Sequence, residues 1–485
     1  MKLFKIVIFF FLSILIISCS KKDDIPTDIQ TQNFVWKGLN AYYLWQKEIN
    51  DLSDRRFSSD DELNNYLSDY DNPEDLFNNL LHIPNEYPKD PNKTYSWIVD
   101  DYIALEQSFQ GTRLTTGMKV KGADFADGSG YYVYVYDVVK NSDAETKGIT
   151  RGMLFNMIDG VQLTETNYQG LLFGDNTIYT VGFADYNVGN PTSNGTTISL
   201  TKEELQENPI AVSKVITDGA AKIGYLLYNQ FASSFDAQLN AAFANFNSEN
   251  IDDLIIDLRY NGGGSVRTAT YLGSMVTGQF NSSLFSKQVW NEKVQAAIDP
   301  SNFENNFTNQ IDHDGINEAI HSLGLSRVYF IVTGSSASAS ELIINSLSSY
   351  IDVYLVGTTT VGKQVGSITL YDSDDYTKGN PTLSQNHTYA MQPIVLEIKN
   401  SIDQNEPNGF TPGVTLPGIE FPEDYGNLGV LGERSDPLLD RTLVYIATGA
   451  RINFVNEIDK ARTIEISNSK LATPSGNNMY VDFKK

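Results

Sequence analysis

The stretch that decides the fold reads Leu254-Ile255-Ile256-Asp257-Leu258-Arg259-Tyr260-Asn261-Gly262-Gly263-Gly264, a nearly unbroken apolar run that ends in three glycines. Such a run is typical of a strand that is buried on both faces, as strands of parallel sheets are. Similar runs follow at 328–332 and 353–357, with a helical stretch between them. Strand, helix and strand at this spacing predict right-handed crossovers and a largely parallel α/β core.

The regions outside this core have different patterns. Apolar side chains between residues 35 and 43 recur at helical spacing, which predicts a small helical region before the core. Short strands such as 132–136 then predict a β-rich region. The stretch 281–317 is polar, and we expect it to be an irregular insertion.

Composition and charge limit the classes of function. With 485 residues, of which 41% are hydrophobic and 12% aromatic, the chain is expected to fold into about two to four domains. The formal net charge of −25 argues against a nucleic acid partner, because phosphate binding needs clustered lysine and arginine.

The first residues have the pattern of an export signal. Lys2 and Lys5 accompany a largely apolar run of 12 residues (6–17), which is shorter than the roughly 20 residues that span a bilayer. Ile16-Ile17-Ser18-Cys19 resembles a bacterial lipobox, and Cys19 is the only cysteine, so a disulfide within the chain is impossible. We expect an exported lipoprotein, anchored through a lipid on Cys19 to a membrane of the bacterial cell envelope. The alternative is an ordinary secretory signal with an incidental cysteine.

Three segments with chemically useful residues lie just after predicted strands, where α/β folds usually place their active residues. The first is the glycine loop, in which the N–H of Gly263 or Gly264 could donate to a developing oxyanion. A phosphate-binding loop is the alternative, but Ser265-Val266 stands where that motif needs lysine and then serine or threonine.

The second segment contains Ser338, at the start of a predicted helix. Ser338 and Glu341 have the spacing of a capping box, so this serine could simply begin the helix. A serine at a helix N-terminus is also well placed to be a nucleophile, because the N–H of Ala339 faces the same pocket and the helix dipole favours negative charge there.

The third segment contains Lys363, in a loop of small residues. A lysine in such a loop is usually solvated, but a serine nucleophile needs a base. A buried lysine with a lowered pKa can be that base, and serine with lysine is a known variant of the catalytic triad. A Ser-His-Asp hydrolase is the alternative, although none of the four histidines lies in a comparable strand-end motif: His82, His313, His321 and His387.

In order and spacing, these motifs resemble the signature motifs of the carboxyl-terminal processing (tail-specific) proteases, which are PDZ-containing Ser-Lys serine peptidases. The lysine follows the serine by 25 residues, as in that family. The resemblance implies that Ser338 is the nucleophile, that Lys363 is its general base, and that the oxyanion hole uses Ala339 with Gly264 or Gly263. It also implies an α/β protease core of ClpP/crotonase-like β-β-α type.

Two further expectations depend on this resemblance. Many family members have a glutamine four residues after the lysine, where this chain has Ser367, so Ser367 or Gln364 is the possible orienting residue. The β-rich region resembles a PDZ domain, in which Gly117-Met118-Lys119-Val120 would bind the terminal carboxylate of a peptide. A β-domain without a ligand is the alternative.

We therefore expect a serine endopeptidase that cleaves unfolded or C-terminally exposed polypeptides through an acyl-enzyme, without a cofactor or a metal. The rival hypothesis is a catalytically inactive, peptide-binding surface lipoprotein in which Ser338 only caps its helix. The expected organisation is a signal peptide (1–18), a lipid-anchored tether (19–30), a helical N-terminal region (31–110), a PDZ-like domain (111–206), a peptidase core (207–450) and a C-terminal segment (451–485).

Overall fold

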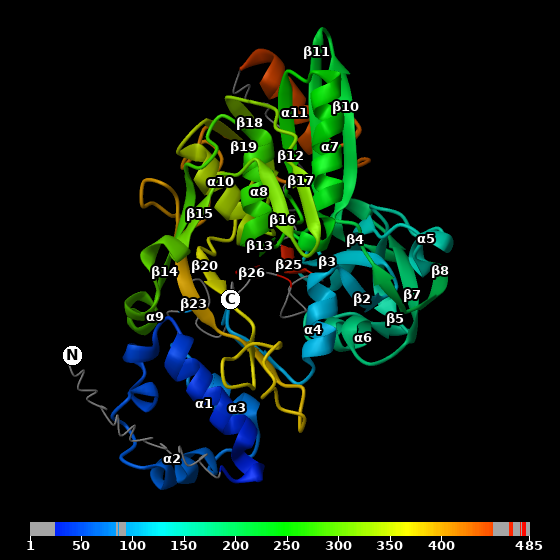
Figure 1. Ribbon diagram of the computed structural model, residues 1–485. Helices are drawn as coiled ribbons and strands as arrows, with labels where there is room; N and C mark the ends of the chain where they lie inside the picture. Colours follow the sequence, from blue (N-terminus) through cyan, green and yellow to red (C-terminus); the bar gives the residue numbers. More distant parts are fainter. Residues whose placement is uncertain are drawn as a thin grey trace, which may run out of the picture.

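The computed structural model describes residues 25–83, 86, 94–449, 465–468, 476 and 478–481, with backbone alone for 465–468. The expected signal peptide and Cys19 lie outside these residues. Figure 1 shows a small helical region, a central α/β region and a separate β-rich region beside it. Within the described parts of the chain, no helix combines the length and the apolar character needed to cross a membrane.

A six-stranded sheet forms the centre of the α/β region, in the order β10-β11-β12-β18-β19-β24. Only β10 and β11 pair antiparallel, and the remaining neighbours are parallel. Its strands are β10 (Ile210–Asp218), β11 (Ala221–Tyr228), β12 (Asp253–Asp257), β18 (Arg327–Val332), β19 (Asp352–Gly357) and β24 (Gly418–Glu420). The three apolar runs predicted as buried strands are therefore confirmed as β12, β18 and β19.

Helices cover both faces of this sheet, because alternate side chains of its strands point to opposite sides. Leu254 and Ile256 pack in the large core with α7 (Asp236–Glu249), α8 (Val266–Val276) and α10 (Ala339–Ser348). Ile255, between them, packs in another cluster with α11 (Pro437–Thr448). The near-continuous apolar character of β12 follows from burial on both faces.

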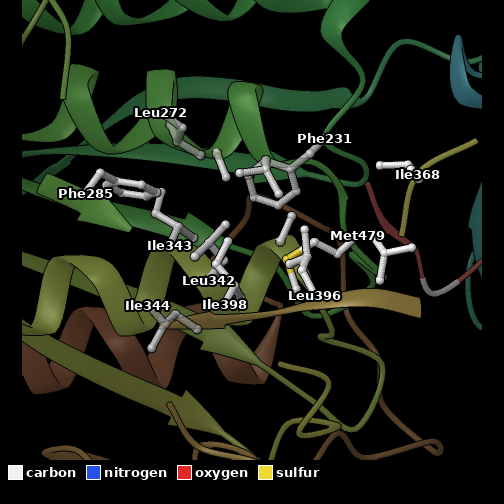
Figure 2. Packing of buried hydrophobic residues seen from close by; sticks show 14 of the residues in the cluster. Phe231, Leu272, Phe285, Leu342, Ile343, Ile344, Ile368, Leu396, Ile398 and Met479 are labelled. Carbon is white, nitrogen blue, oxygen red and sulfur yellow. The ribbon is translucent and has the colours of Figure 1, made fainter. Parts of the chain in front are cut away.

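A second six-stranded sheet lies against α10, in the order β13-β26-β20-β23-β14-β15. Its strands are β13 (Gly264–Ser265), β26 (Met479–Tyr480), β20 (Val365–Ser367), β23 (Ile394–Lys399), β14 (Leu284–Trp290) and β15 (Glu304–Asn306). Figure 2 shows Leu396 and Ile398 of β23 packing with Leu342 and Ile343 of α10. Residues far apart in the chain thus complete one core.

The polar stretch 281–317 is ordered rather than irregular, so that prediction was wrong. It contains β14, α9 (Glu292–Ala297), β15 and a hairpin whose strands are β16 (Gln310–His313) and β17 (Ile316–Ala319). Its sparse apolar residues, such as Phe285 and Phe307, are buried in the main core, and they hold the polar strands in place.

The helical N-terminal region is confirmed, with α1 (Gln30–Tyr42), α2 (Asp60–Leu67) and α3 (Pro73–Asn79). Side-chain caps begin two of these helices: Ser59 accepts from the Glu62 N–H, and Asn72 accepts from the Asp75 N–H. Val35, which is fully buried, belongs to the same apolar cluster as the α/β core. The chain then joins the α/β region through β1 (Trp97–Val99), β21 (Leu370–Tyr371) and β22 (Ala390–Gln392).

The β-rich region has its own apolar core, around a sheet with the order β25-β3-β4-β5-β7-β8 and with β6 paired to β5. Its strands are β3 (Met118–Asp124), β4 (Tyr131–Val138), β5 (Leu154–Ile158), β6 (Val161–Gln162), β7 (Ile178–Asp185), β8 (Thr192–Thr201) and β25 (Glu465–Asn468). Its helices are α5 (Asp143–Thr146) and α6 (Tyr168–Phe173), while α4 (Tyr102–Phe109), β2 (Thr112–Thr115) and β9 (Glu203–Gln206) lie at its border with the core.

Candidate active site

Ser338 lies between β18 and α10, fully buried and in a strained backbone conformation. Its φ of 60° is unusual for a residue with a Cβ, and such strain is typical of positions that the surrounding structure holds in place. The Ser338 N–H donates to Glu341 Oε2 (2.9 Å), but its Oγ has no hydrogen-bond partner among the residues that the structure describes. Ser338 is thus the N-cap position of α10 and the Glu341 side chain caps its N–H, but Ser338 Oγ makes no capping hydrogen bond and is left available for other chemistry.

The loop that carries Ser338 is fastened to the glycine loop by hydrogen bonds. The Ala337 N–H donates to the Asn261 carbonyl (3.1 Å), and Ser340 Oγ donates to the same oxygen (2.9 Å). Ser336 Oγ donates to the Leu258 carbonyl (2.8 Å). Because the first two motifs share these bonds, they form one rigid unit at the carboxyl ends of β12 and β18.

Gly263 faces the nucleophile loop so closely that no side chain fits there. Its φ is 114°, and a Cβ on this residue would lie 2.6 Å from Ser338 Cβ and 3.0 Å from the Ala339 nitrogen. The Gly263 N–H donates to Asn261 Oδ1 (2.9 Å), so the expectation that Gly263 could be an oxyanion donor is not supported. Ala339 and Gly264 are the candidate donors that this geometry leaves.

Lys363 is buried, with 1% of its surface exposed, which contradicts the alternative of a solvated lysine. Burial lowers the pKa of its amine to about 7, and the carboxylates of Glu86 and Glu341 act in the opposite direction. Its Nζ lies 4.6 Å from the centre of the Tyr95 ring. Because Ser338 Oγ has no hydrogen-bond partner, serine and lysine are not directly bonded in this structure.

Glu341 joins the serine loop to the lysine loop. Its Oε2 accepts from the N–H of Ser338 (2.9 Å) and of Lys363 (2.8 Å). Its Oε1 accepts from the Gly362 N–H (2.6 Å) and from Thr360 Oγ1 (2.5 Å). The sequence indicated Glu341 only as part of a capping box, whereas the structure gives it a second role: one buried carboxylate sets the relative positions of both loops.

Glu86 brings the N-terminal region to the site, and no sequence motif indicated it. It is buried and accepts from the N–H groups of Tyr95 (3.0 Å) and Ser96 (3.1 Å) and from the Tyr43 hydroxyl (3.1 Å). Burial raises the pKa of the Glu86 carboxyl, and these hydrogen bonds oppose the rise. A carboxyl group 277 residues away along the sequence thus contributes to the electrostatics of Lys363.

Neither expected orienting residue bonds to Lys363. Ser367 Oγ lies within hydrogen-bond distance of Gln392 Oε1 (2.6 Å) and Asn478 Oδ1 (3.0 Å). The amide nitrogen and oxygen of Gln364 are buried and have no hydrogen-bond partner within the described part of the chain. The expectation that Ser367 or Gln364 orients the lysine is therefore not supported.

The histidines do not bond to the serine. His313 pairs with Asp236 (2.8 Å) and Asp314 (3.1 Å), and His387 pairs with Asp372 (3.0 Å). Because Ser338 Oγ is unpaired, the geometry gives no support to a Ser-His-Asp arrangement.

A buried ionic cluster lies at the end of β12, directly before the glycine loop. Arg259 is fully buried, and its Nη2 lies 2.6 Å from Asp257 Oδ2, while its Nη1 donates to Asp436 Oδ1 (3.0 Å). These contacts tie the end of β12 to the start of α11. Burying a single charge in the protein interior costs much free energy, and pairing the guanidinium with two carboxylates offsets that cost.

The expected carboxylate-binding loop lies at the start of β3, beside a cavity of about 640 Å³. Met118 and Lys119 line this cavity, together with Arg113, Leu114 and Phe173. Lys119 Nζ is 3.0 Å from Asp137 Oδ2. The cavity therefore combines apolar walls with charged groups at the edge of the β-rich region.

Two parts of the chain match known family sequences. Residues 30–97 match the Peptidase S41 N-terminal domain, and residues 222–378, which contain Ser338 and Lys363, match Peptidase family S41. The chain is 25% identical over 353 residues to the chloroplastic C-terminal processing peptidase of Tetradesmus obliquus, covering 69% of this chain and 67% of that one.

Another relative and a solved structure agree with these matches. The chain is 25% identical over 252 residues to the chloroplastic carboxyl-terminal-processing peptidase 3 of Arabidopsis thaliana, which covers 49% of this chain and 44% of that relative. The fold resembles a crystal structure from Bacteroides fragilis NCTC 9343 whose name refers to the S41 proteases, with a TM-score of 0.63 and 21% identity. That comparison covers 86% of this chain and 97% of the other.

Proposed function

Since this chain is a serine peptidase of family S41, similar to C-terminal processing peptidases, we propose that it is an endopeptidase whose catalytic pair is Ser338 and Lys363. The observation that carries the proposal is the shared burial of both residues, on loops that a single carboxylate, Glu341, holds together. A lysine with a pKa of about 7 has a substantial neutral fraction at physiological pH, as a general base requires.

The proposed reaction follows from this arrangement. Ser338 Oγ attacks the carbonyl carbon of the scissile peptide bond while its proton passes to Lys363 Nζ. The N–H groups of Ala339 and Gly264 donate to the oxyanion that forms. Lys363 then gives the proton to the leaving amine. A water molecule, deprotonated by the same lysine, attacks the acyl-enzyme ester, and the lysine returns that proton to Ser338 Oγ as the acyl–oxygen bond breaks. The two side chains must come within hydrogen-bond distance before attack, because they are not hydrogen-bonded here.

We further propose that the β-rich region is a PDZ-like domain that captures unfolded or C-terminally exposed polypeptides. The cavity beside Met118 and Lys119 supports this, because its mixture of apolar walls and charged groups suits the end of a peptide chain. The leader pattern supports export and lipid attachment at Cys19. Labelling of cells with a palmitate analogue would test that attachment, which Cys19→Ala should abolish.

Catalysis is tested by substituting each member of the pair. Ser338→Ala and Lys363→Ala should each abolish cleavage of an unfolded substrate such as casein without changing the far-UV circular dichroism. Lys287→Ala is the matched control, because Lys287 is a partly exposed lysine paired with Asp403 on the surface. Wild-type turnover in Lys363→Ala would disprove the proposed pair.

A serine-reactive fluorophosphonate distinguishes an active peptidase from the rival hypothesis of an inactive peptide-binding protein. The probe should label wild-type protein at Ser338, because its hydroxyl is activated. If the folded wild-type chain binds peptides but neither reacts with the probe nor cleaves casein, the binding protein is the better interpretation.

A further inference from the structure

The catalytic cleft contains part of this chain itself. The cleft segment, residues 478–481, includes β26, which pairs in parallel with β13 through Gly264 opposite Met479. On its other side β26 pairs with β20 through Tyr480 opposite Ser367, and the Val481 N–H donates to the Ser367 carbonyl (3.1 Å). The segment therefore lies as an extended strand between the glycine loop and the strand that follows Lys363.

A backbone carbonyl of the cleft segment lies beside the reaction centre. The Asn478 carbonyl oxygen and Ser338 Cβ are 2.5 and 2.6 Å from the same point, the position that a Cβ on Gly263 would take. The Ala339 nitrogen is 3.0 Å from that point. A peptide carbonyl thus occupies the space next to the proposed nucleophile and one of its proposed oxyanion donors.

The side chains of the cleft segment fill pockets along the cleft. Met479 is fully buried, and Figure 2 shows it beside Leu396, with Phe231 and Ile368 nearby. Tyr480 stacks on Phe109 of α4, with ring centres 4.6 Å apart. One cavity lined by the glycine loop, Asn478 and Tyr480 has a volume of about 10 Å³, close to the smallest that holds one water molecule. The segment therefore occupies the position beside the glycine loop that a substrate strand would take.

The backbone of another part of the chain, β25, lies along the edge of the strand that begins beside the proposed peptide cavity. β25 adds to the edge of β3 in antiparallel register, with Glu465 opposite Ala123 and Asn468 opposite Lys121. It therefore runs toward Gly117, as a peptide does when it adds a strand to a sheet edge. The edge of β3 and the space at the glycine loop, where the proposed function would place substrate strands, are thus held by β25 and by residues 478–481, whereas the cavity beside Met118 and Lys119 is open.

We propose that the cleft segment is an internal occupant of the substrate site, bound as an extended peptide would be, and that it must leave before a polypeptide can be cleaved. This inference rests on the proposed function. It also assigns a substrate preference: the pocket of Phe231, Ile368 and Leu396 takes an apolar side chain immediately after the scissile carbonyl, where Met479 follows Asn478.

Two variants test whether the cleft segment competes with substrate. One ends before Gly476, and the other, Tyr480→Asp, keeps the full chain but places a charge against Phe109. Each should raise kcat/KM for casein by about tenfold or more, because a larger fraction of the protein molecules then has an empty substrate site. The peptide Asn-Met-Tyr-Val should inhibit the shortened variant competitively, and the control peptide Asn-Asp-Tyr-Val should not.

A binding readout separates failure of this inference from failure of the proposed function. In a Ser338→Ala background, a fluorescent Asn-Met-Tyr-Val peptide should bind the shortened chain or the Tyr480→Asp chain at least about tenfold more tightly than the full chain. If Tyr480→Asp is folded but shows unchanged or lower activity and peptide affinity, then β26 is a structural strand and the inference is wrong. Peptide affinity could also rise as expected while no variant cleaves casein or reacts with a fluorophosphonate. In that case the proposed peptidase function is wrong, but the inference that residues 478–481 occupy a peptide-binding site is supported.

Discussion

Lowering the pH should switch the site off near neutrality, because Lys363 must be uncharged to accept the Ser338 proton. Burial lowers the pKa of Lys363 from 10.5 to about 7, and the ammonium form that predominates below this value cannot act as a base. Activity therefore rises with pH and reaches half of its plateau near pH 7. For one titrating group, about one tenth of the plateau remains at pH 6 and about nine tenths is reached at pH 8.

The assay is kcat/KM for a fluorogenic peptide between about pH 5.5 and pH 10, with the rate of fluorophosphonate labelling as a second measure. Glu86→Gln should move the midpoint to lower pH, because the Glu86 carboxylate raises the pKa of Lys363. Glu74→Gln is the control, since Glu74 binds the Tyr389 hydroxyl instead. A flat profile, or a midpoint near the ordinary lysine pKa of about 10.4, would refute the reasoning.

Stability gives an independent readout of the same pKa. The folded-state pKa of Lys363 lies below its unfolded value, so between about pH 7 and pH 10.5 the unfolded chain binds one more proton. The free energy of unfolding should therefore rise with pH in this range, by up to about 1.4 kcal/mol per pH unit. Lys363→Met removes this contribution, which urea unfolding measures. Equal pH slopes for both proteins would show that the lysine is not perturbed.

Three substitutions test the supports of the site. Glu341→Gln should lower kcat by about 100-fold with little change in KM, because an amide cannot accept all the N–H groups that hold the two loops in position; equal kcat in steady-state assays would contradict this. Arg259→Met should lower the free energy of unfolding in urea by about 3–5 kcal/mol, because Asp257 stays buried without its counter-charge. Gly263→Ala should abolish peptide cleavage through its clash with the nucleophile loop, whereas Gly170→Ala, where a Cβ meets nothing within 4 Å, should behave as wild type.

Local pattern was enough to predict several elements of this protein. The run Leu254-Ile255-Ile256-Asp257-Leu258 indicated a buried strand because burial on both faces removes polar alternation, and β12 confirms it. The helical spacing between residues 35 and 43 indicated α1 for a similar reason. The three loop motifs were also recognisable, because each follows a strand and the carboxyl ends of parallel strands share one edge.

Pairings between distant segments could not be predicted in this way. Three such pairings depend on how separate elements pack: Glu86 beside Lys363, Glu341 between the two loops, and Asn478 against Ser338. The periodicity of a sequence indicates only which face of one element is buried. The orienting role expected for Gln364 is not supported for the same reason, since nearness in sequence does not make two side chains meet.

The sequence by itself determined the catalytic chemistry that we propose only through the resemblance of its three motifs, in order and spacing, to those of the carboxyl-terminal processing proteases. Only the tertiary structure decided whether that lysine is buried and which segment lies beside the glycine loop. Burial lowers the pKa of Lys363, and β26 fills the cleft from more than 100 residues further along the chain. Both effects arise from packing, which no local stretch of sequence records.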